Sequence, residues 1–531
     1  MYAQDKILIG RGDQPVYLLP GMVSRHGLIA GATGTGKTVT LKVMAEGLSD
    51  MGVPVFLADV KGDVSGTALP GADSEKMRQR LQKVGVDPAS FAYHGYPCRF
   101  WDVFGKGGTP VRATVSEVGP LLFARLLDLT EVQEGVLNLV FKIADDNGWQ
   151  LIDWKDLREM IAFAGERAKE FTTDYGNISP QSIGAIQRSL LALENAGAAQ
   201  FFGEPELDIG DWIAQDADGR GIINILHCVE LFQQPLLYST FMLWLLSELY
   251  EALPEVGDIA KPKLVFFFDE AHLLFTDAPK VLVQKIVQVV KLIRSKGVGI
   301  YFITQSPADI PDEVLAQLNN RVQHALRAYT PAEQKAVRTA AQSFRPNPAF
   351  KTEEVIANLG TGCALVSLLG EDGAPGIVQQ ATICPPQSRM APLDDATRAQ
   401  LIAMNPLHAK YKDAVDTRSA YEILSEEEAA EDAARQAEED AKAEEKALRE
   451  EARRQREEER ALQAQYRAEG RDRNGRTKLE RSVRRAASTT ARGVGRSLGR
   501  SITRGVLGTS NRTISSAAGS LVGSLLGDLF K

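Results

Sequence analysis

The segment from Gly31 to Thr38, which reads GATGTGKT, restricts the folds open to this chain more than any other part of the sequence. It follows a short apolar run that ends at Ala30 and precedes a helical pattern, VTLKVMAEGL. Glycines let such a loop bend so that backbone N–H groups converge on phosphate oxygens, and the helix dipole adds positive potential. The pattern therefore predicts a phosphate-binding loop between a strand and a helix.

This loop contains the side chains expected to bind a nucleoside triphosphate. Lys37 is expected to reach the β- and γ-phosphates, and the Thr38 hydroxyl is expected to bind Mg²⁺. The candidate nucleotide-binding residues are Gly31, Ala32, Thr33, Gly34, Thr35, Gly36, Lys37, Thr38 and Val39. The sequence thus predicts ATP and Mg²⁺ as cofactors.

A second motif, LVFFFDEAH, is a hydrophobic strand pattern that ends in two adjacent acids, Asp269 and Glu270. A carboxylate in this place holds Mg²⁺ through water, so Asp269 is the second candidate metal ligand. Glu270 is expected to polarise the attacking water as a general base. Gln305 follows the next predicted strand, at the edge where α/β sheets bind ligands, and is expected to contact the γ-phosphate and the water. Together these residues predict an ATP hydrolase.

The four residues from Asp269 to His272 read Asp-Glu-Ala-His, which also occurs in helicases with two tandem motor lobes. We do not favour that interpretation, because nothing after Gln305 supplies a second lobe. His272 is instead expected to be a local switch or a core histidine.

Short β-branched runs alternate with helical patterns from residue 1 to about 386, which predicts a parallel α/β sheet. The expected strands are Gly27–Ala30, Val53–Val60, Ile222–Cys228, Leu264–Asp269, Gly299–Thr304, Val322–Ala328 and Cys363–Leu369. Residues 115–215 carry several helix patterns and few strand signals, which indicates an all-helical insertion. The expected fold class is α/β, a RecA-like P-loop motor core with this insertion and a charged helical or disordered C-terminal tail.

The core is expected to occupy residues 1–114 and 216–418, followed by a charged helix or linker over 419–480 and a basic, amphipathic, glycine-rich tail over 481–531. Residues 425–460 contain 15 acidic and 8 basic side chains among 36, which is typical of a solvated helix or a disordered stretch. In the tail, arginines recur every four residues beside an apolar stripe, at Arg492, Arg496, Arg500 and Arg504. DNA phosphates, an anionic membrane surface and a second helix are its candidate partners, and a flexible tail that binds nothing is the alternative.

The net charge of −8 argues against a protein that coats nucleic acid along its whole surface. Four cysteines without metal-ligand spacing predict neither a zinc site nor a disulfide framework. The N-terminus lacks the pattern of a signal peptide, and the most apolar helix candidate, residues 236–253, is expected in the core and not in a membrane. These features predict a cytoplasmic protein, with the tail as a candidate peripheral contact at the inner membrane.

With these motifs in this order, the chain resembles the HerA/FtsK superfamily of hexameric DNA pumps, and it looks closest to the HerA-like proteins of the YjgR group. The resemblance covers about residues 7–386. It rests on the segments GLIAGATGTGKT, LADVKGDVSG, LVFFFDEAH and RSKGVGIYFITQSPADIP. Relatives typically have an Asp-Pro-Lys-Gly-like turn after the second strand, where this chain has Val60 between Asp59 and Lys61.

The resemblance implies a homo-oligomer, most simply a hexameric ring, in which a neighbouring subunit supplies an arginine that accelerates hydrolysis. Arg321 matches the family's position best, and Arg294 and Arg327 are its rivals. The implied function is that of a HerA-like DNA translocase or helicase. A secretion- or conjugation-type ATPase acting on protein and a nucleotide-controlled assembly scaffold stay open as alternatives. HerA carries a β-barrel ahead of its motor, but only a short strand pair is expected before Lys37, so a HerA-type role in DNA end resection is not expected.

Overall fold

The computed structural model describes residues 2–195, 197–275 and 280–469. The chain forms two compact units, which are divided between Glu422 and Ile423. The first unit holds a large sheet with its covering helices, and the second holds most of the long charged helix α15 (Ala420–Glu469). The charged segment is therefore helical over its described part. The arginine stripe predicted in the tail lies outside the described residues.

The first unit is built on one 13-stranded sheet with the order β1-β2-β13-β12-β11-β4-β10-β9-β5-β8-β6-β7, and β3 pairs with β2. The strands are β1 (Tyr2–Ala3), β2 (Lys6–Arg11), β3 (Pro15–Leu18), β4 (Gly27–Ala30), β5 (Val55–Asp59), β6 (Cys98–Asp102), β7 (Thr109–Pro110), β8 (Ile223–His227), β9 (Leu264–Phe268), β10 (Val298–Thr304), β11 (Asn320–Gln323), β12 (Cys363–Ser367) and β13 (Gln379–Ile383). Neighbouring strands from β11 to β7 are parallel. The predicted α/β fold class is confirmed.

The other end of the sheet is antiparallel, so the expectation of a wholly parallel sheet is wrong there. Strand β12 pairs antiparallel with β11 and β13, and β2 pairs antiparallel with β13, β3 and β1. All seven expected strands form: β4 has the expected bounds, β10 begins one residue earlier, β11 is shifted toward the N-terminus, and the other four are shorter. Strands β6, β7 and β13 were not expected, because their sequences, CRFWD, TP and QQATI, are short and carry polar residues.

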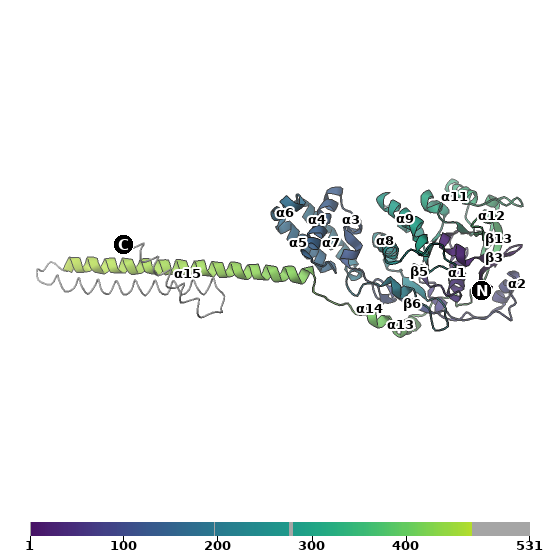
Figure 1. Ribbon diagram of the computed structural model, residues 1–531, viewed down its shortest axis with the longest axis horizontal. Coiled ribbons are helices and arrows are strands. Elements are labelled where there is room, and N and C mark those ends of the chain that lie inside the picture. The colour runs from purple at the N-terminus through teal and green to yellow at the C-terminus, as the bar shows by residue number, and fades with distance from the viewer. Residues whose placement is uncertain (1, 196, 276–279, 470–531) are drawn as a thin grey trace. The chain divides into compact units, whose positions relative to one another are not determined.

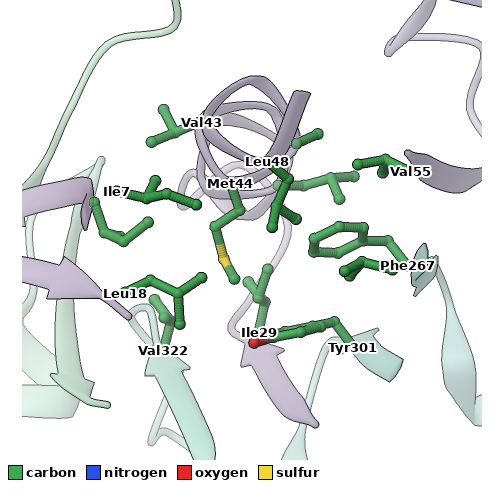
Figure 2. Close-up of a cluster of buried hydrophobic side chains, with 14 of the residues drawn as sticks. Ile7, Leu18, Ile29, Val43, Met44, Leu48, Val55, Phe267, Tyr301 and Val322 are labelled. Carbon is green, nitrogen blue, oxygen red and sulfur yellow. The ribbon is translucent and has the colours of Figure 1, made fainter. Parts of the chain in front are cut away.

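Helix α1 (Lys37–Asp50) packs on one face of the sheet. Figure 2 shows Met44 and Leu48 of this helix directed into a cluster with Ile29 of β4 and Phe267 of β9, and all of these side chains are buried. On the opposite side of these strands, Phe56 of β5 stacks on Trp212, with ring centroids 4.7 Å apart. Strands buried on both faces explain the continuous apolar runs in the sequence.

The other α-helices are α2 (Glu75–Lys83), α3 (Val115–Leu126), α4 (Glu131–Asn147), α5 (Trp154–Glu166), α6 (Ala168–Tyr175), α7 (Pro180–Asn195), α8 (Pro235–Ala252), α9 (Lys280–Leu292), α10 (Asp312–Leu315), α11 (Pro331–Gln342), α12 (Thr352–Asn358), α13 (Asp395–Met404) and α14 (His408–Tyr411). Helices α3 to α7 follow one another without an intervening strand and group together beside the sheet (Figure 1), so the predicted helical insertion is confirmed. Helix α8 is largely buried, as expected. Within the described residues, no helix combines the length and the apolar character needed to cross a membrane.

Residues 384–422, which we call the C-terminal strap, run from β13 back across the first unit to the helical insertion. The buried Glu46 of α1 accepts hydrogen bonds from the backbone N–H groups of Gln387 and Ser388, at 2.7 and 3.2 Å. Further along, the buried Tyr411 donates to Asp211. The strap is thus bound to the core at successive points along its length.

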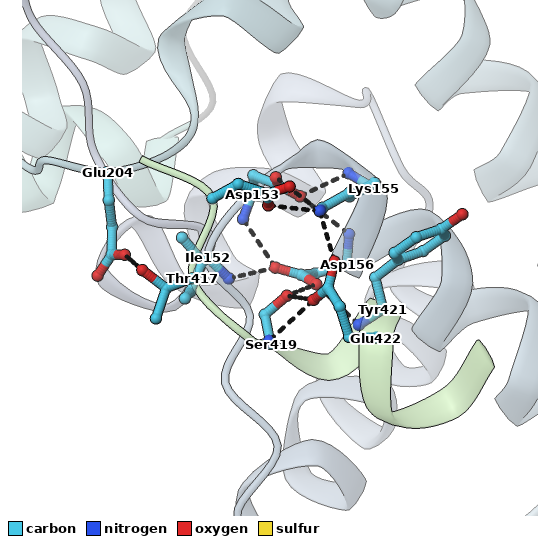
Figure 3. Close-up of polar contacts among 10 residues, drawn as sticks. Ile152, Asp153, Lys155, Asp156, Glu204, Thr417, Ser419, Tyr421 and Glu422 are labelled. Atoms are coloured by element: carbon cyan, nitrogen blue, oxygen red, sulfur yellow. Dashed lines mark hydrogen bonds and ion pairs between the residues drawn. The ribbon is translucent and has the colours of Figure 1, made fainter. Parts of the chain in front are cut away.

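The end of the strap is fixed to helix α5 by Asp156, whose side chain is fully buried. Figure 3 shows this carboxylate between two chain segments. It accepts from the backbone N–H groups of Ile152 and Asp153, at 2.8 and 3.0 Å, and so caps α5. It also accepts from the Ser419 hydroxyl and from the Tyr421 N–H, at 2.5 and 2.9 Å, where α15 begins. One side chain therefore joins the insertion to the start of the charged helix.

Candidate nucleotide site

The glycine-rich loop between β4 and α1 is held in shape by the two strands that flank β4. Gly31 N–H donates to the carbonyl of Thr304, at the end of β10, over 3.2 Å. Ala32 N–H donates to the carbonyl of Ala325, just beyond β11, over 2.8 Å. The Lys37 ammonium folds over the loop and donates to the carbonyls of Gly31 and Ala32, at 2.6 and 3.2 Å. The loop is thus preformed, with its lysine inside it.

His324, at the end of β11, supports the loop from behind. Its ring is buried, and a Cβ added to Gly31 would lie 2.5 Å from the His324 Cβ, so only glycine fits there. Burial lowers the pKa of His324 to about 4, which keeps the ring neutral. Nδ1 lies 3.1 Å from the carbonyl of Cys363 and donates to it, so Nε2 accepts from the Thr40 hydroxyl over 2.8 Å.

The two acids follow β9, which is separated from β4 by β10 alone. Both Asp269 and Glu270 are buried. Burial raises the pKa of Asp269 to about 6, against the opposing charge of Lys61, and a bound cation would favour the ionised form. Glu270 has a left-handed backbone, with φ 47° and ψ 46°, which is unusual outside glycine and costs conformational energy that the surrounding structure must offset.

Three side chains contact the Glu270 carboxylate. The Lys61 ammonium lies 2.9 Å from Oε1, and Gln305 Nε2 donates to Oε2 over 3.4 Å. His272 Nδ1 also lies 3.4 Å from Oε2. Burial pushes the pKa of Glu270 upward, but hydrogen bonding and attraction to Lys61 outweigh it, so the pKa lies below its usual value. The structure thus brings Glu270 and Gln305 together and adds Lys61, to which the sequence had given no role.

Further carboxylates lie near the expected metal position. Thr38 Oγ1 donates to Asp63 Oδ2 over 3.4 Å, and Asp59 ends β5 beside β9. Asp59 Oδ2 accepts from the Val64 N–H, but Oδ1 is buried and has no hydrogen-bond partner in the described structure. Burial, with the nearby charge of Asp63, raises the pKa of Asp59 to about 7.

These oxygen donors fit Mg²⁺, which prefers carboxylate and hydroxyl oxygens. Mg²⁺ beside a nucleotide is held by one or two protein groups, with phosphates and water completing the shell. Thr38 and Asp269 are enough for that arrangement. Accordingly, the described part of the chain contains no group of three or more His, Cys, Asp or Glu side chains able to hold an ion by themselves.

The three candidate arginines have different surroundings. The Arg321 guanidinium donates to three backbone carbonyls of its own chain, at 2.9, 2.8 and 2.6 Å, those of Leu315, Leu318 and Ser343. This gives Arg321 a structural role and leaves its assignment as the trans-acting arginine without geometric support. Arg294 pairs with Asp258 over 2.6 Å. Arg327 is exposed and lies four residues beyond the end of β11 in the chain.

Comparison with known proteins gives the family. Residues 4–513 match the family described as "Helicase HerA-like C-terminal". The chain belongs to the HerA-like family. The predicted resemblance to HerA is therefore confirmed, and with it a P-loop ATPase core.

Individual relatives of this HerA-like chain are distant. It is 21% identical over 355 residues to the DNA double-strand break repair helicase HerA of Sulfolobus acidocaldarius, which covers 65% of this chain and 62% of that protein. The bacterial conjugative coupling protein TrwB is similar in structure, with 15% identity, coverage of 75% and 93%, and a TM-score of 0.49. VirB4 of Thermoanaerobacter pseudethanolicus shows 17% identity, coverage of 72% and 97%, and a TM-score of 0.47.

Sequence reasoning left out several residues of this site, namely Asp59, Lys61, Asp63 and His324. The segment LADVKGDVSG supplied part of the resemblance, but no role was assigned to its charged residues. The position of this segment was a usable signal for a role at the site. It follows a predicted strand, and in a parallel sheet that strand can lie beside the one that ends at Asp269. His324 had no such signal, since its contacts depend on β11 lying next to β4.

Proposed function

We propose that this HerA-like protein hydrolyses ATP with Mg²⁺ and works as a homohexameric ring that moves DNA. The observation that supports the proposal is that the P-loop, the Asp269–Glu270 pair and Gln305 lie at the same edge of the sheet. The strand order brings them together, because β10 lies between β4 and β9. The family supports an ATPase of this type.

Each side chain has a separate task in this proposal. Lys37 leaves the carbonyls of Gly31 and Ala32 to bind the β- and γ-phosphates, while the loop N–H groups bind phosphate oxygens. Thr38 and Asp269 hold Mg²⁺, which supplies charge neutralisation on the phosphates when it is bound. Glu270 accepts the proton of the attacking water, and Gln305 orients that water.

The choice of DNA as substrate is supported by the family, whose description names a helicase, and by the curated relative, whose name places it in DNA repair. Because the match spans 62% of that relative, its whole activity is carried over only as a proposal. A ring would let a neighbouring subunit supply an arginine to the phosphates. The exposure of Arg327 makes it a better candidate than Arg321, whose donors are bound to its own chain.

The decisive experiment measures ATP turnover with and without linear duplex DNA, together with the native mass with and without ATP. We expect turnover that DNA stimulates several-fold and a mass of six chains. Glu270→Gln serves as the control for contaminating ATPases. Turnover no higher than that of Glu270→Gln would refute ATP hydrolysis. Turnover that DNA leaves unchanged would refute the DNA motor and favour a motor acting on protein, and a monomer in the presence of ATP would refute the ring.

The C-terminal tail, residues 481–531, is proposed as an accessory anchor for DNA or an anionic membrane surface in a cytoplasmic protein. Its support is the arginine repeat in the sequence, since positive charge near a phosphate surface gives salt-dependent affinity. Binding of the full chain to linear duplex DNA and to anionic vesicles, each compared with a chain that lacks the tail, would separate the two surfaces.

A further inference from the structure

The loop after β5 carries a lysine that is paired with the proposed general base. Lys61 Nζ lies 2.9 Å from Glu270 Oε1, and the exposed fractions of the two side chains are 40% and 5%. A carboxylate that shares its charge with an ammonium group at this distance is a weak acceptor for a water proton. While this ion pair is intact, Lys61 therefore keeps Glu270 inactive as a general base.

The charge of the same ammonium group also reaches the phosphate-binding lysine. Strands β5 and β9 are parallel neighbours, with Ala58 opposite Phe268, so Lys61 and Glu270 emerge at one edge of the sheet. Burial, and after it the positive charge of Lys61, lowers the pKa of Lys37, so the two ammonium groups are within electrostatic range of each other. A triphosphate bound at the loop carries the negative charge that would attract both groups.

The backbone around Lys61 is fixed, whereas its side chain is partly solvated. Ser65 Oγ donates to the Gly62 carbonyl over 3.2 Å and accepts from the Leu393 N–H of the strap over 3.0 Å. Asp59 Oδ2 accepts from the Val64 N–H over 3.2 Å. A flexible four-carbon side chain on a fixed backbone can change its partner without movement of the loop.

We propose that Lys61 is a positioning residue that exchanges Glu270 for the γ-phosphate when ATP binds. In the free protein Lys61 holds the Glu270 carboxylate. The γ-phosphate then draws Lys61 away and leaves Glu270 free to accept the water proton, whereas ADP, which lacks that phosphate, leaves the pair intact. This inference rests on the proposed function, because it requires that ATP occupy the site.

The exchange predicts a specific coupling between two substitutions. Replacing Glu270 by glutamine removes the repulsion between its carboxylate and the phosphates, whether or not Lys61 is present. When Lys61 is present, the replacement also removes the ion pair that ATP binding would have to break. We therefore expect Glu270→Gln to increase the affinity for the non-hydrolysable analogue AMP-PNP in both backgrounds. The increase should be about fivefold larger in the protein that keeps Lys61 than in the Lys61→Gln variant, which corresponds to the strength of a partly exposed ion pair. Affinity for ADP should stay within about twofold in all four proteins.

Two further variants separate positioning from a general structural effect. Lys61→Arg keeps the positive charge and should retain most of the coupling. Lys106→Gln is the matched control, because Lys106 forms an ion pair with Glu230 over 2.7 Å, with exposed fractions of 66% and 47%, and should leave both affinities unchanged. The exchange would be refuted if Glu270→Gln increased the AMP-PNP affinity equally with Lys61 and with Lys61→Gln. It would also be refuted if the variants lost affinity for ADP and AMP-PNP in parallel. Failure of the wild-type protein to bind either nucleotide would instead refute the proposed function itself.

Discussion

Replacing Asp156 with alanine should destabilise the junction between the helical insertion and the C-terminal strap. The carboxylate accepts four hydrogen bonds, two from the start of α5 and two from the residues where α15 begins. Two of the four donors, the Ile152 N–H and the Ser419 hydroxyl, are buried, and the other two are partly buried. Alanine would leave the three backbone donors without this acceptor, whereas the Ser419 hydroxyl could still donate to Glu422 Oε2, 2.7 Å away.

The size of the effect follows from these contacts. A buried donor without an acceptor costs about 1–3 kcal/mol, and a partly buried donor recovers some of that from water. The total for one buried and two partly buried donors is roughly 2–5 kcal/mol. At about 1 °C per kcal/mol for a folding unit of this size, the Tm should fall by roughly 2–5 °C.

Thermal unfolding, followed by fluorescence, measures the loss of stability, and limited trypsin digestion reports whether the strap is released. In Asp156→Ala, cleavage after Arg418 should become much faster. Lys155→Met is the matched control, since it removes ion pairs to Asp416 and Glu422, whose side chains are 75% and 29% exposed, and should cost about 1 kcal/mol or less per pair. A Tm for Asp156→Ala equal to that of Lys155→Met, with unchanged cleavage, would refute the idea that Asp156 joins the two segments.

Three further predictions concern the motor and the tail. Lys37→Ala should abolish ATP binding in a fluorescent-nucleotide assay, whereas Glu270→Gln should keep ATP bound and reduce turnover by about 10²–10⁴-fold; wild-type turnover by Glu270→Gln would exclude it as the base. Arg327→Ala should lower turnover without changing the affinity for ATP, and mixing it with Lys37→Ala should restore part of the activity. Arg321→Ala should mainly lower the Tm. The opposite pattern would restore Arg321 as the trans-acting arginine. A chain ending at Glu469 should keep its basal turnover and lose affinity for DNA or anionic vesicles, and loss of basal turnover in a folded protein would assign the tail to the motor.

Most strands of the central sheet could be predicted because they belong to local apolar runs, and β4, β9 and β10 also adjoin a recognisable motif. Strand β9, LVFFF before the two acids, is an example. The antiparallel end could not be predicted in the same way. Strand β13, QQATI, is polar on its own and becomes a strand only because β2 and β12 supply partners on both sides. Its formation depends on long-range pairing, which periodicity does not report.

The site shows the same division between local and long-range information. The residues Lys37, Thr38, Asp269 and Glu270 could be named because each belongs to a short motif. The pairing of Lys61 with Glu270 could not, since it depends on β5 and β9 being neighbours although they are far apart in the chain. Asp156 is a similar case, because its position suggests only the capping of α5. Its bonds to Ser419 and Tyr421 join segments that no local pattern connects.

The position of β4 also has a consequence for the synthesis of the protein. This strand carries the phosphate-binding loop, yet both strands beside it, β10 and β11, come much later in the chain. They follow it by about 270 residues or more, so at about 5–20 residues per second the nascent loop waits roughly 15–50 s for them. The carbonyls of Thr304 and Ala325 that hold the loop also arrive only then. A nascent chain therefore acquires its ATP site only after the helical insertion and β9 have left the ribosome, and nucleotide binding can serve as a signal that β10 and β11 have joined the sheet.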